Sequence, residues 1–151
     1  MFELDGKTAL VTGATRGIGE ASARALDAAG ARVILSGRTA SDLARVASEL
    51  TNEPITLEVD LSPPGAGTQH AEQVLEATGG EGVDIIVNNA GIPMRRTPQE
   101  LSEEDFDLVF SINVRSLLML TIGLAEPMKR REEGSIINIS SVASLRGPLG
   151  R

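Results

Sequence analysis

Short apolar runs alternate with helical patterns along the whole chain. Runs of apolar and β-branched residues predict five strands, at 7–12, 31–36, 54–60, 83–91 and 134–140. Between them, alanine-rich stretches and apolar residues spaced three and four positions apart predict four helices, at 17–30, 39–50, 67–78 and 102–133. The last helix begins with a capping pattern, in which Ser102 stands three residues before Asp105.

This alternation of strands and helices predicts an α/β fold. Continuous apolar strands separated by helices are typical of a parallel sheet with helices on both faces. Right-handed crossovers then give a Rossmann-type doubly wound sheet of five strands in the order 3-2-1-4-5. No linker, repeat or low-complexity segment divides the chain, so residues 1–151 are expected to form a single dinucleotide-binding domain.

Composition removes several function classes. The net charge is −7, and no basic run suits nucleic acid or an anionic membrane. There is no cysteine, which excludes disulfides and thiolate metal ligands, and no metal site is expected. The one histidine, His70, is expected to be a solvated loop or helix-end residue. No unbroken run reaches the roughly 18 apolar residues of a membrane span, so the cytoplasm is the expected compartment.

The segment TGATRGIG, at 12–19, joins the first strand to the first helix. Gly13 permits a tight turn, Gly17 allows a pyrophosphate to approach the backbone, and Gly19 lets the helix pack close to the strand. The first amides of the helix then face the anion. A tight turn without a ligand is the alternative interpretation. No Lys-Ser/Thr pair follows the glycines, so this is not a P-loop.

Four motifs in order resemble the short-chain dehydrogenases/reductases: TGATRGIG, NNAG at 88–91, Asn113, and NISS at 138–141. The resemblance covers the whole chain. It implies an NAD(P)-dependent oxidoreductase that transfers hydride between the cofactor and a small carbonyl or alcohol substrate. The cofactor-binding residues that it implies are Gly13, Thr15, Arg16, Gly17, Ile18, Gly19, Arg38, Asp60, Asn89, Ala90 and Gly91.

The end of the second strand favours NADP over NAD. NAD-preferring relatives usually have an acid there, whereas this chain has Gly37 followed by Arg38. A guanidinium pairs with the 2′-phosphate that an acid would repel, and Arg16 adds a second charge. Two solvated arginines are the alternative. By the same resemblance Asp60 contacts adenine, with a helix-capping or loop aspartate as the alternative. Asn88 is expected to tie down the fourth strand.

Two catalytic residues follow from the resemblance. Asn113 corresponds to an asparagine that breaks the regularity of its helix and holds a water in a proton relay. It stands among apolar residues, so we expect a buried amide, with an ordinary core amide as the alternative. Ser141 corresponds to the serine that binds the substrate oxygen, because it lies 28 residues after Asn113.

The acid/base of the family is a tyrosine in a Tyr-x-x-x-Lys motif about a dozen residues beyond this serine. The chain contains no tyrosine. We therefore expect the cofactor-binding front of a reductase, truncated before its catalytic helix and inactive alone. The alternative is a non-catalytic nucleotide-binding module or an incomplete fragment. The strand at 134–140 would form a sheet edge, and the helix at 102–133 is apolar on more than one face, so a homo-oligomer is expected.

Overall fold

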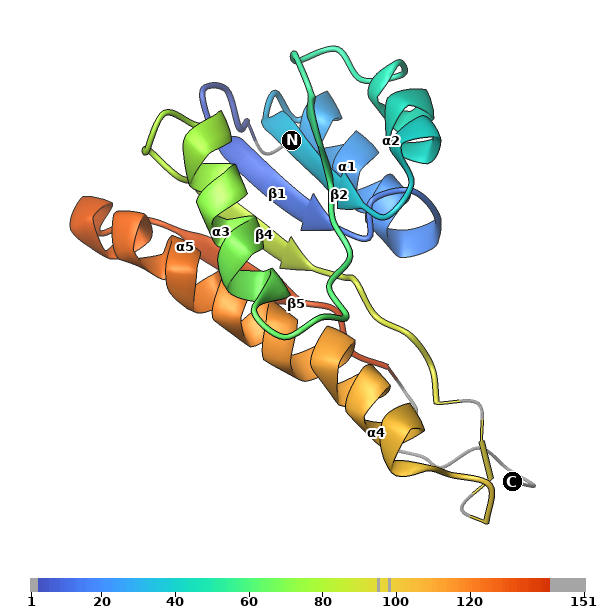
Figure 1. The fold of residues 1–151 in the computed structure, drawn as a ribbon. Coiled ribbons are helices and arrows are strands. Elements are labelled where there is room, and N and C mark those ends of the chain that lie inside the picture. The colour runs from blue at the N-terminus through green and yellow to red at the C-terminus, as the bar shows by residue number, and fades with distance from the viewer. Residues whose placement is uncertain (1–2, 95, 98, 142–151) are drawn as a thin grey trace.

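A computed structural model of the chain describes residues 3–94, 96–97 and 99–141. Its strands form one parallel sheet in the order β3-β2-β1-β4-β5, so the predicted topology is confirmed (Figure 1). The strands are β1 Thr8–Thr12, β2 Arg32–Gly37, β3 Ile55–Glu58, β4 Ile85–Asn88 and β5 Ser135–Asn138. The helices are α1 Gly17–Ala28, α2 Ala40–Ala47, α3 Ala66–Ala77, α4 Glu103–Phe110, the π-helical η1 Ser111–Ser116 and α5 Leu117–Arg131.

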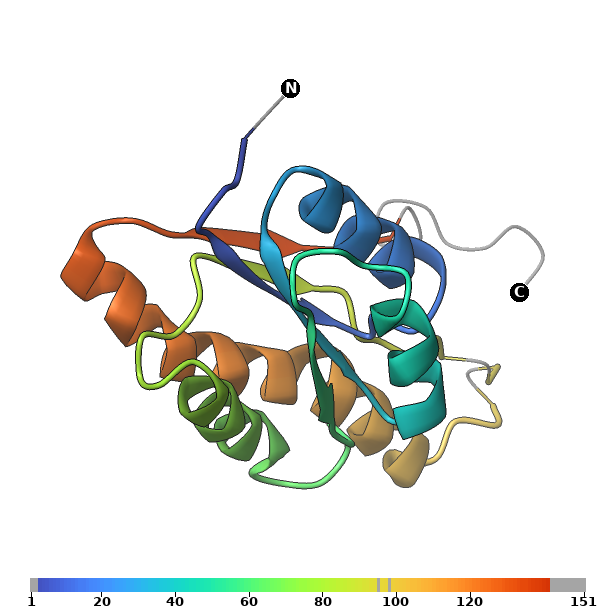
Figure 2. The ribbon, with the colours of Figure 1, turned by 90° about the horizontal axis from the view of Figure 1, so that it is seen from above.

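The sheet lies between two layers of helices, as the view from above shows (Figure 2). Strand side chains alternate between the faces, which produces two separate cores. On one face, Val11, Val33 and Leu35 pack with the buried residues of α1 and α2. On the other, Leu10 and Ile34 pack with buried residues of α3 and α5. β1, β2 and β4 contribute side chains to both cores.

The predicted helix at 102–133 is one continuous rod with a π-helical segment in the middle. Ser102 and Asp105 form the predicted capping box, in which each side chain accepts from the backbone amide of the other. Asn113 lies inside η1, so the expected break in helical regularity at this residue is confirmed. Glu132, in the left-handed conformation, ends the rod.

This rod is apolar enough, by length and composition, to cross a membrane. Over Glu103–Arg131 an 18-residue window reaches a mean hydropathy of 1.8, although its longest unbroken apolar run is short. In the fold the rod is a layer packed on the sheet and on α3. Leu120 and Leu124 are fully buried, and a Cβ on Gly123 would lie 2.5 Å from the Ala71 Cβ, so the two helices approach closely.

β5 differs from the other strands because it is exposed along its whole length. It pairs with β4, and its backbone is in register with Ile85–Asn88. All four of its residues are nevertheless exposed, including Ile136 and Ile137. Ser141 follows three residues after the strand ends and is also exposed.

Candidate functional site

The glycine turn after β1 is built as the sequence predicts. Gly13 and Gly17 have φ angles of +65° and +57°, which side-chain-bearing residues rarely adopt. A Cβ on Gly19 would lie 2.2 Å from the Gly13 carbonyl oxygen, so only glycine lets α1 begin this close to the turn. A Cβ on Gly17 would meet nothing within 4 Å, which leaves its backbone open to a ligand.

Thr12 and Asn89 hold this turn against the end of β4. The Thr12 hydroxyl accepts from the backbone amides of Asn89 and Ala90, each at 3.0 Å. The Asn89 side chain donates from Nδ2 to the carbonyl oxygens of Thr12 at 2.9 Å and Gly13 at 3.1 Å. The Asn89 side chain therefore supports the turn, although the residue also lines the cleft described below.

α1 begins at this turn, and its first backbone amides have no hydrogen-bond acceptor in the part of the chain that the structure describes. Arg16 is the N-cap, and its side chain makes no capping hydrogen bond. Within the described residues, the backbone amides of Gly17 and Ile18 have no acceptor. Free amides at a helix N-terminus, combined with the helix dipole, favour a bound phosphate.

A cleft of about 410 Å³ opens beside the turn, at the carboxyl ends of β1, β2, β3 and β4. This is a volume typical of small-molecule sites. Of the predicted cofactor residues, all but Gly19 line it, and Gly19 lies beneath the turn. The structure adds further lining residues, which sequence reasoning missed as site residues: Ser36, Gly37, Val59, Leu61, Ile92 and Ile112.

Most of these further lining residues could have been predicted from the sequence. Ser36, Val59 and Leu61 flank positions at the ends of predicted strands, where a doubly wound sheet binds its ligands. Ile92 follows the NNAG motif directly. Ile112 belongs to the long helix, and its approach to the cleft depends on the π-helical segment, which no periodicity in the sequence specifies.

The cationic side of the cleft is formed by Arg16 and Arg38, both exposed. In the described part of the chain neither guanidinium forms an ion pair, so both remain available to an anionic ligand. Gly37 is buried, and a Cβ there would lie 2.9 Å from Thr15 Cγ2. The cleft therefore has positive charge at the end of β2 and no acid at position 37.

Asp60 holds a loop, as one of the two interpretations of the sequence predicted, and it also lies at the cleft. Its carboxylate accepts from the backbone amide and from the hydroxyl of Ser62, both at 2.9 Å, which fixes the loop before α3. The residue also lines the cleft. No metal ligand set accompanies it, because the described residues contain no group of three or more His, Asp or Glu side chains that could hold an ion.

The expectation for His70 was wrong. His70 is fully buried in α3, where Nε2 lies 2.8 Å from the Ser36 hydroxyl and Nδ1 lies 3.1 Å from Oε1 of Gln73. Since Gln73 Oε1 can only accept, Nδ1 carries the proton and Nε2 accepts from Ser36. Burial lowers the pKa of His70, with the Gln73 hydrogen bond opposing it. His70 therefore links α3 to β2 behind the cleft wall.

The expectation that Asn113 is buried was also wrong. Asn113 is exposed, and its amide bonds the backbone of Ile92 at both ends: Oδ1 accepts from the amide and Nδ2 donates to the carbonyl, each at 2.9 Å. Its neighbours Phe110 and Val114 are about half-exposed, so the helix face it occupies is not a core face. Asn113 thereby fixes Ile92, which lines the cleft. Asn113 itself is not a lining residue.

Asn88 joins three elements beside this site. It is buried at the end of β4, and its Nδ2 donates to Thr121 Oγ1 in α5 and to Asn138 Oδ1 in β5, both at 2.9 Å. Its Oδ1 has no partner among the described residues. This arrangement agrees with the structural role expected for the first asparagine of NNAG.

The topology, the glycine turn and the cleft define a Rossmann-type domain. The model of the short chain dehydrogenase family matches residues 7–150, so the chain belongs to this family. It is 44% identical to nodulation protein G of Rhizobium sp. (strain N33), and the match covers 100% of this chain and 61% of the relative. The chain spans about three-fifths of the length of most of the curated relatives it matches.

Solved structures of family members superpose closely on the fold. A 3-oxoacyl (acyl-carrier-protein) reductase from Agrobacterium tumefaciens C58, with NADP bound, has a TM-score of 0.87 at 36% identity, covering 96% of this chain and 56% of that one. L-sorbose reductase from Gluconobacter frateurii, complexed with NADPH and L-sorbose, has a TM-score of 0.89 at 28% identity, covering 97% and 57%. The shared fold extends over nearly the whole of this chain.

Proposed function

We propose that this chain binds NADP(H) in the cleft and forms the cofactor-binding part of a cytoplasmic oxidoreductase. The reaction is hydride transfer between the cofactor and a small carbonyl or alcohol substrate, and the nicotinamide supplies the hydride chemistry. The observation that carries the proposal is the glycine turn, whose free amides and open Gly17 backbone border a cleft of about 410 Å³. The NADP and NADPH bound to structural neighbours agree with it.

The charge at the end of β2 supports NADP(H) over NAD(H). Arg38 and Arg16 line the cleft without an ion-pair partner in the described part of the chain. A charge-assisted hydrogen bond to a 2′-phosphate contributes about 1.5–3 kcal/mol, which corresponds to roughly tenfold to a hundredfold in affinity. Position 37 offers no carboxylate to the ribose hydroxyls of NAD(H).

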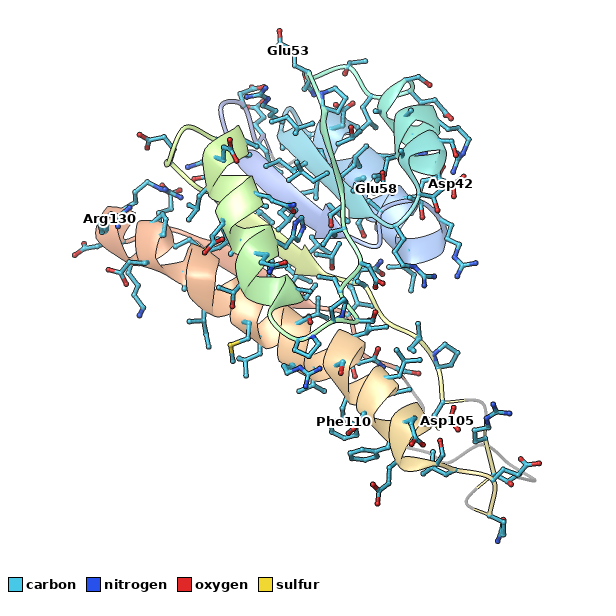
Figure 3. The ribbon with its side chains drawn as sticks, viewed as in Figure 1. Asp42, Glu53, Glu58, Asp105, Phe110 and Arg130 are labelled. Atoms are coloured by element: carbon cyan, nitrogen blue, oxygen red, sulfur yellow. The ribbon has the colours of Figure 1, made fainter. Side chains whose placement is uncertain are left out.

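Calorimetric titration with NADPH and NADH tests this assignment. The unsubstituted chain should bind NADPH more tightly, and Arg38→Ala should remove roughly tenfold to a hundredfold of that affinity while leaving NADH nearly unchanged. Arg130→Ala is the matched control, because Arg130 is exposed at the far end of α5, away from the cleft (Figure 3). Equal binding of NADH and NADPH by the unsubstituted chain would overturn the cofactor assignment.

We also propose catalytic roles for Asn113 and Ser141. The Ile92 backbone occupies both ends of the Asn113 amide, so the side chain acts first by positioning the cleft wall. Ser141 follows β5 at the edge of the sheet and would bind the substrate oxygen. The 151 residues contain no tyrosine, so we propose that this polypeptide alone binds cofactor without turnover. NADPH oxidation by the purified 151-residue chain with any carbonyl substrate would contradict this.

A second copy of the chain is the partner we propose for the exposed side of the long helix. Five exposed apolar residues recur at every fourth position, which we call the 106–122 stripe: Phe106, Phe110, Val114, Leu118 and Ile122. The rings of Phe106 and Phe110 stack, with centroids 4.2 Å apart, and Phe110 points away from the sheet (Figure 3). A continuous apolar stripe on an exposed helix is typical of a self-association surface.

A further inference from the structure

One side chain of α2 contacts the backbone of the glycine turn. Nη2 of Arg45 donates to the carbonyl oxygen of Thr15 at 2.8 Å. Thr15 precedes the N-cap of α1, and within the described residues no backbone amide donates to this carbonyl. Arg45 therefore satisfies a carbonyl of the turn that α1 itself leaves unpaired.

A frame of ion pairs between α1 and α2 fixes the Arg45 guanidinium. Arg45 contacts Glu20 at 3.0 Å, Glu20 also pairs with Arg24 at 2.6 Å, and Arg24 pairs with Glu49 at 2.7 Å. Hydrogen bonds from Arg45 and then Arg24 lower the pKa of Glu20 to about 2. Glu20 therefore stays ionised at neutral pH, and Arg45 keeps its partner there.

The Arg45 contact decides which way one peptide unit of the turn faces. In a trans peptide the carbonyl and the following amide point in opposite directions, and the described residues contain no cis peptide. Holding the Thr15 carbonyl toward α2 therefore turns the Arg16 amide away from α2. The other side of Thr15 is close to β2, since a Cβ on Gly37 would lie 2.9 Å from its methyl group.

We propose that Arg45 is a positioning residue, which fixes the Thr15–Arg16 peptide so that the amides of the turn face the pyrophosphate of a bound dinucleotide. This inference rests on the proposed function of the cleft. Arg45 does not itself line the cleft, so it acts through the turn and not by touching the ligand. Arg24 belongs to the same ion-pair frame but has no contact with Thr15, which makes it a matched comparison.

Two ligands separate positioning of the turn from other effects. ADP-ribose contains the pyrophosphate, whereas adenosine 2′-monophosphate contains adenine, one ribose and the 2′-phosphate but no pyrophosphate. Arg45→Ala should weaken ADP-ribose binding roughly three- to tenfold, the range expected for one lost hydrogen bond, and leave adenosine 2′-monophosphate unchanged. Arg24→Ala leaves the contacts of Arg45 with Glu20 and Thr15 in place and should affect neither ligand. Equal losses in the two variants, or an equal loss for the two ligands with Arg45→Ala, would overturn the inference.

Amide hydrogen exchange of the chain without ligand gives an independent readout. Arg45→Ala should accelerate exchange at the amides of Ala14 and Glu20, which donate to the carbonyl oxygens of Ser36 and Arg16, relative to both the unsubstituted chain and Arg24→Ala, because the turn loses its anchor. Unchanged exchange at these amides would contradict the inference whether or not ligand binds. Failure of the unsubstituted chain to bind ADP-ribose would instead contradict the proposed function, so the two failures are distinguishable.

Discussion

An inner strand and an edge strand of the sheet contain similar sequences in different surroundings. Ile34 in β2 and Ile137 in β5 both lie in short strands rich in β-branched residues. Ile34 is fully buried in the core shared with α3 and α5, whereas Ile137 is 44% exposed on a strand that, among the described residues, pairs with β4 alone. Local sequence therefore specifies a strand in both places, and burial depends on how many elements cover it.

The same contrast separates the cleft from the long helix. The cleft is bordered by β1, β2 and the start of α1, which are held by hydrogen bonds from Thr12, Asn89 and Arg45. The 106–122 stripe is as apolar as the core, yet nothing in the described residues covers it. A site that must present fixed amides to a ligand lies in the covered region, while the uncovered region is suited to recognition of another surface.

The largest expected effect is on the free energy of unfolding, when the same isoleucine-to-alanine substitution is made in each of the two strands. Ile34→Ala should lower the free energy of unfolding by about 2–5 kcal/mol, the range for large-to-small changes in a packed core. Ile137→Ala should cost less than about half of that, because the side chain is already partly in water. Urea denaturation of both variants measures the difference. A loss at Ile137 equal to that at Ile34 would show that another surface covers β5 in solution.

The sequence predicts the covered region more completely than the uncovered one. Apolar runs and the glycine spacing are sufficient for the strand order and the turn, because these depend on local pattern and on one topology rule. Most lining residues of the cleft were expected from the resemblance to a family. Which side of the long helix faces the sheet depends on the π-helical segment at Ser111–Ser116, and a regular helical period therefore misplaced Asn113.

Side-chain contacts between elements that are distant along the chain could also not be predicted from the sequence. The burial of His70 depends on Ser36 in β2 meeting α3 behind the cleft, across 34 positions of the chain. The Arg45 contact with Thr15 likewise joins α2 to the turn across 30 positions. Neither residue carries a motif, since a lone histidine and an arginine within a helix are both ordinary on a solvated surface.

A charge placed in the 106–122 stripe tests the proposed self-association. Ile122→Glu should weaken association at least about tenfold, because a carboxylate would be desolvated without a partner. Lys129→Gln changes the net charge by the same amount on an exposed position of the same helix and should leave association unchanged. Sedimentation velocity over a concentration series measures both. A monomer at every concentration of the unsubstituted chain would refute the proposed dimer.

A smaller effect is expected from pH, and it arises in the covered region. Burial lowers the pKa of His70 below its value of about 6.5 in an unfolded chain, so the unfolded state binds a proton first as pH falls. The contribution of His70 to the free energy of unfolding should be fully present above a pH of about 6.5. It should decline below that pH, by at most about 1.4 kcal/mol per pH unit for one proton.

His70→Gln should remove this part of the profile while keeping an amide that can bond Ser36. Carboxylates with lowered pKa values, among them Glu20 and Glu133, also contribute to stability. They lose that contribution only as pH falls below their ordinary pKa in the unfolded chain, which lies in the acidic range. The interval between neutral pH and about pH 5 therefore reports on His70. An identical slope in the variant and the unsubstituted chain across this interval would contradict the assignment.

The smallest expected effect concerns an ion pair that joins the two regions. Nζ of Lys7, just before β1, lies 2.7 Å from Oε1 of Glu133, which follows the end of the long helix. Both side chains are substantially exposed. The hydrogen bond and the opposite charge lower the pKa of Glu133 and raise that of Lys7, so the attraction is present at neutral pH. Exposed ion pairs contribute little to stability and are screened by salt.

Glu133→Gln should therefore shift the urea midpoint slightly downward at low ionic strength and not at all at about 1 M salt. A large shift that persists in salt would show that this contact holds the long helix to the sheet, and that the two regions are less independent than their burial indicates.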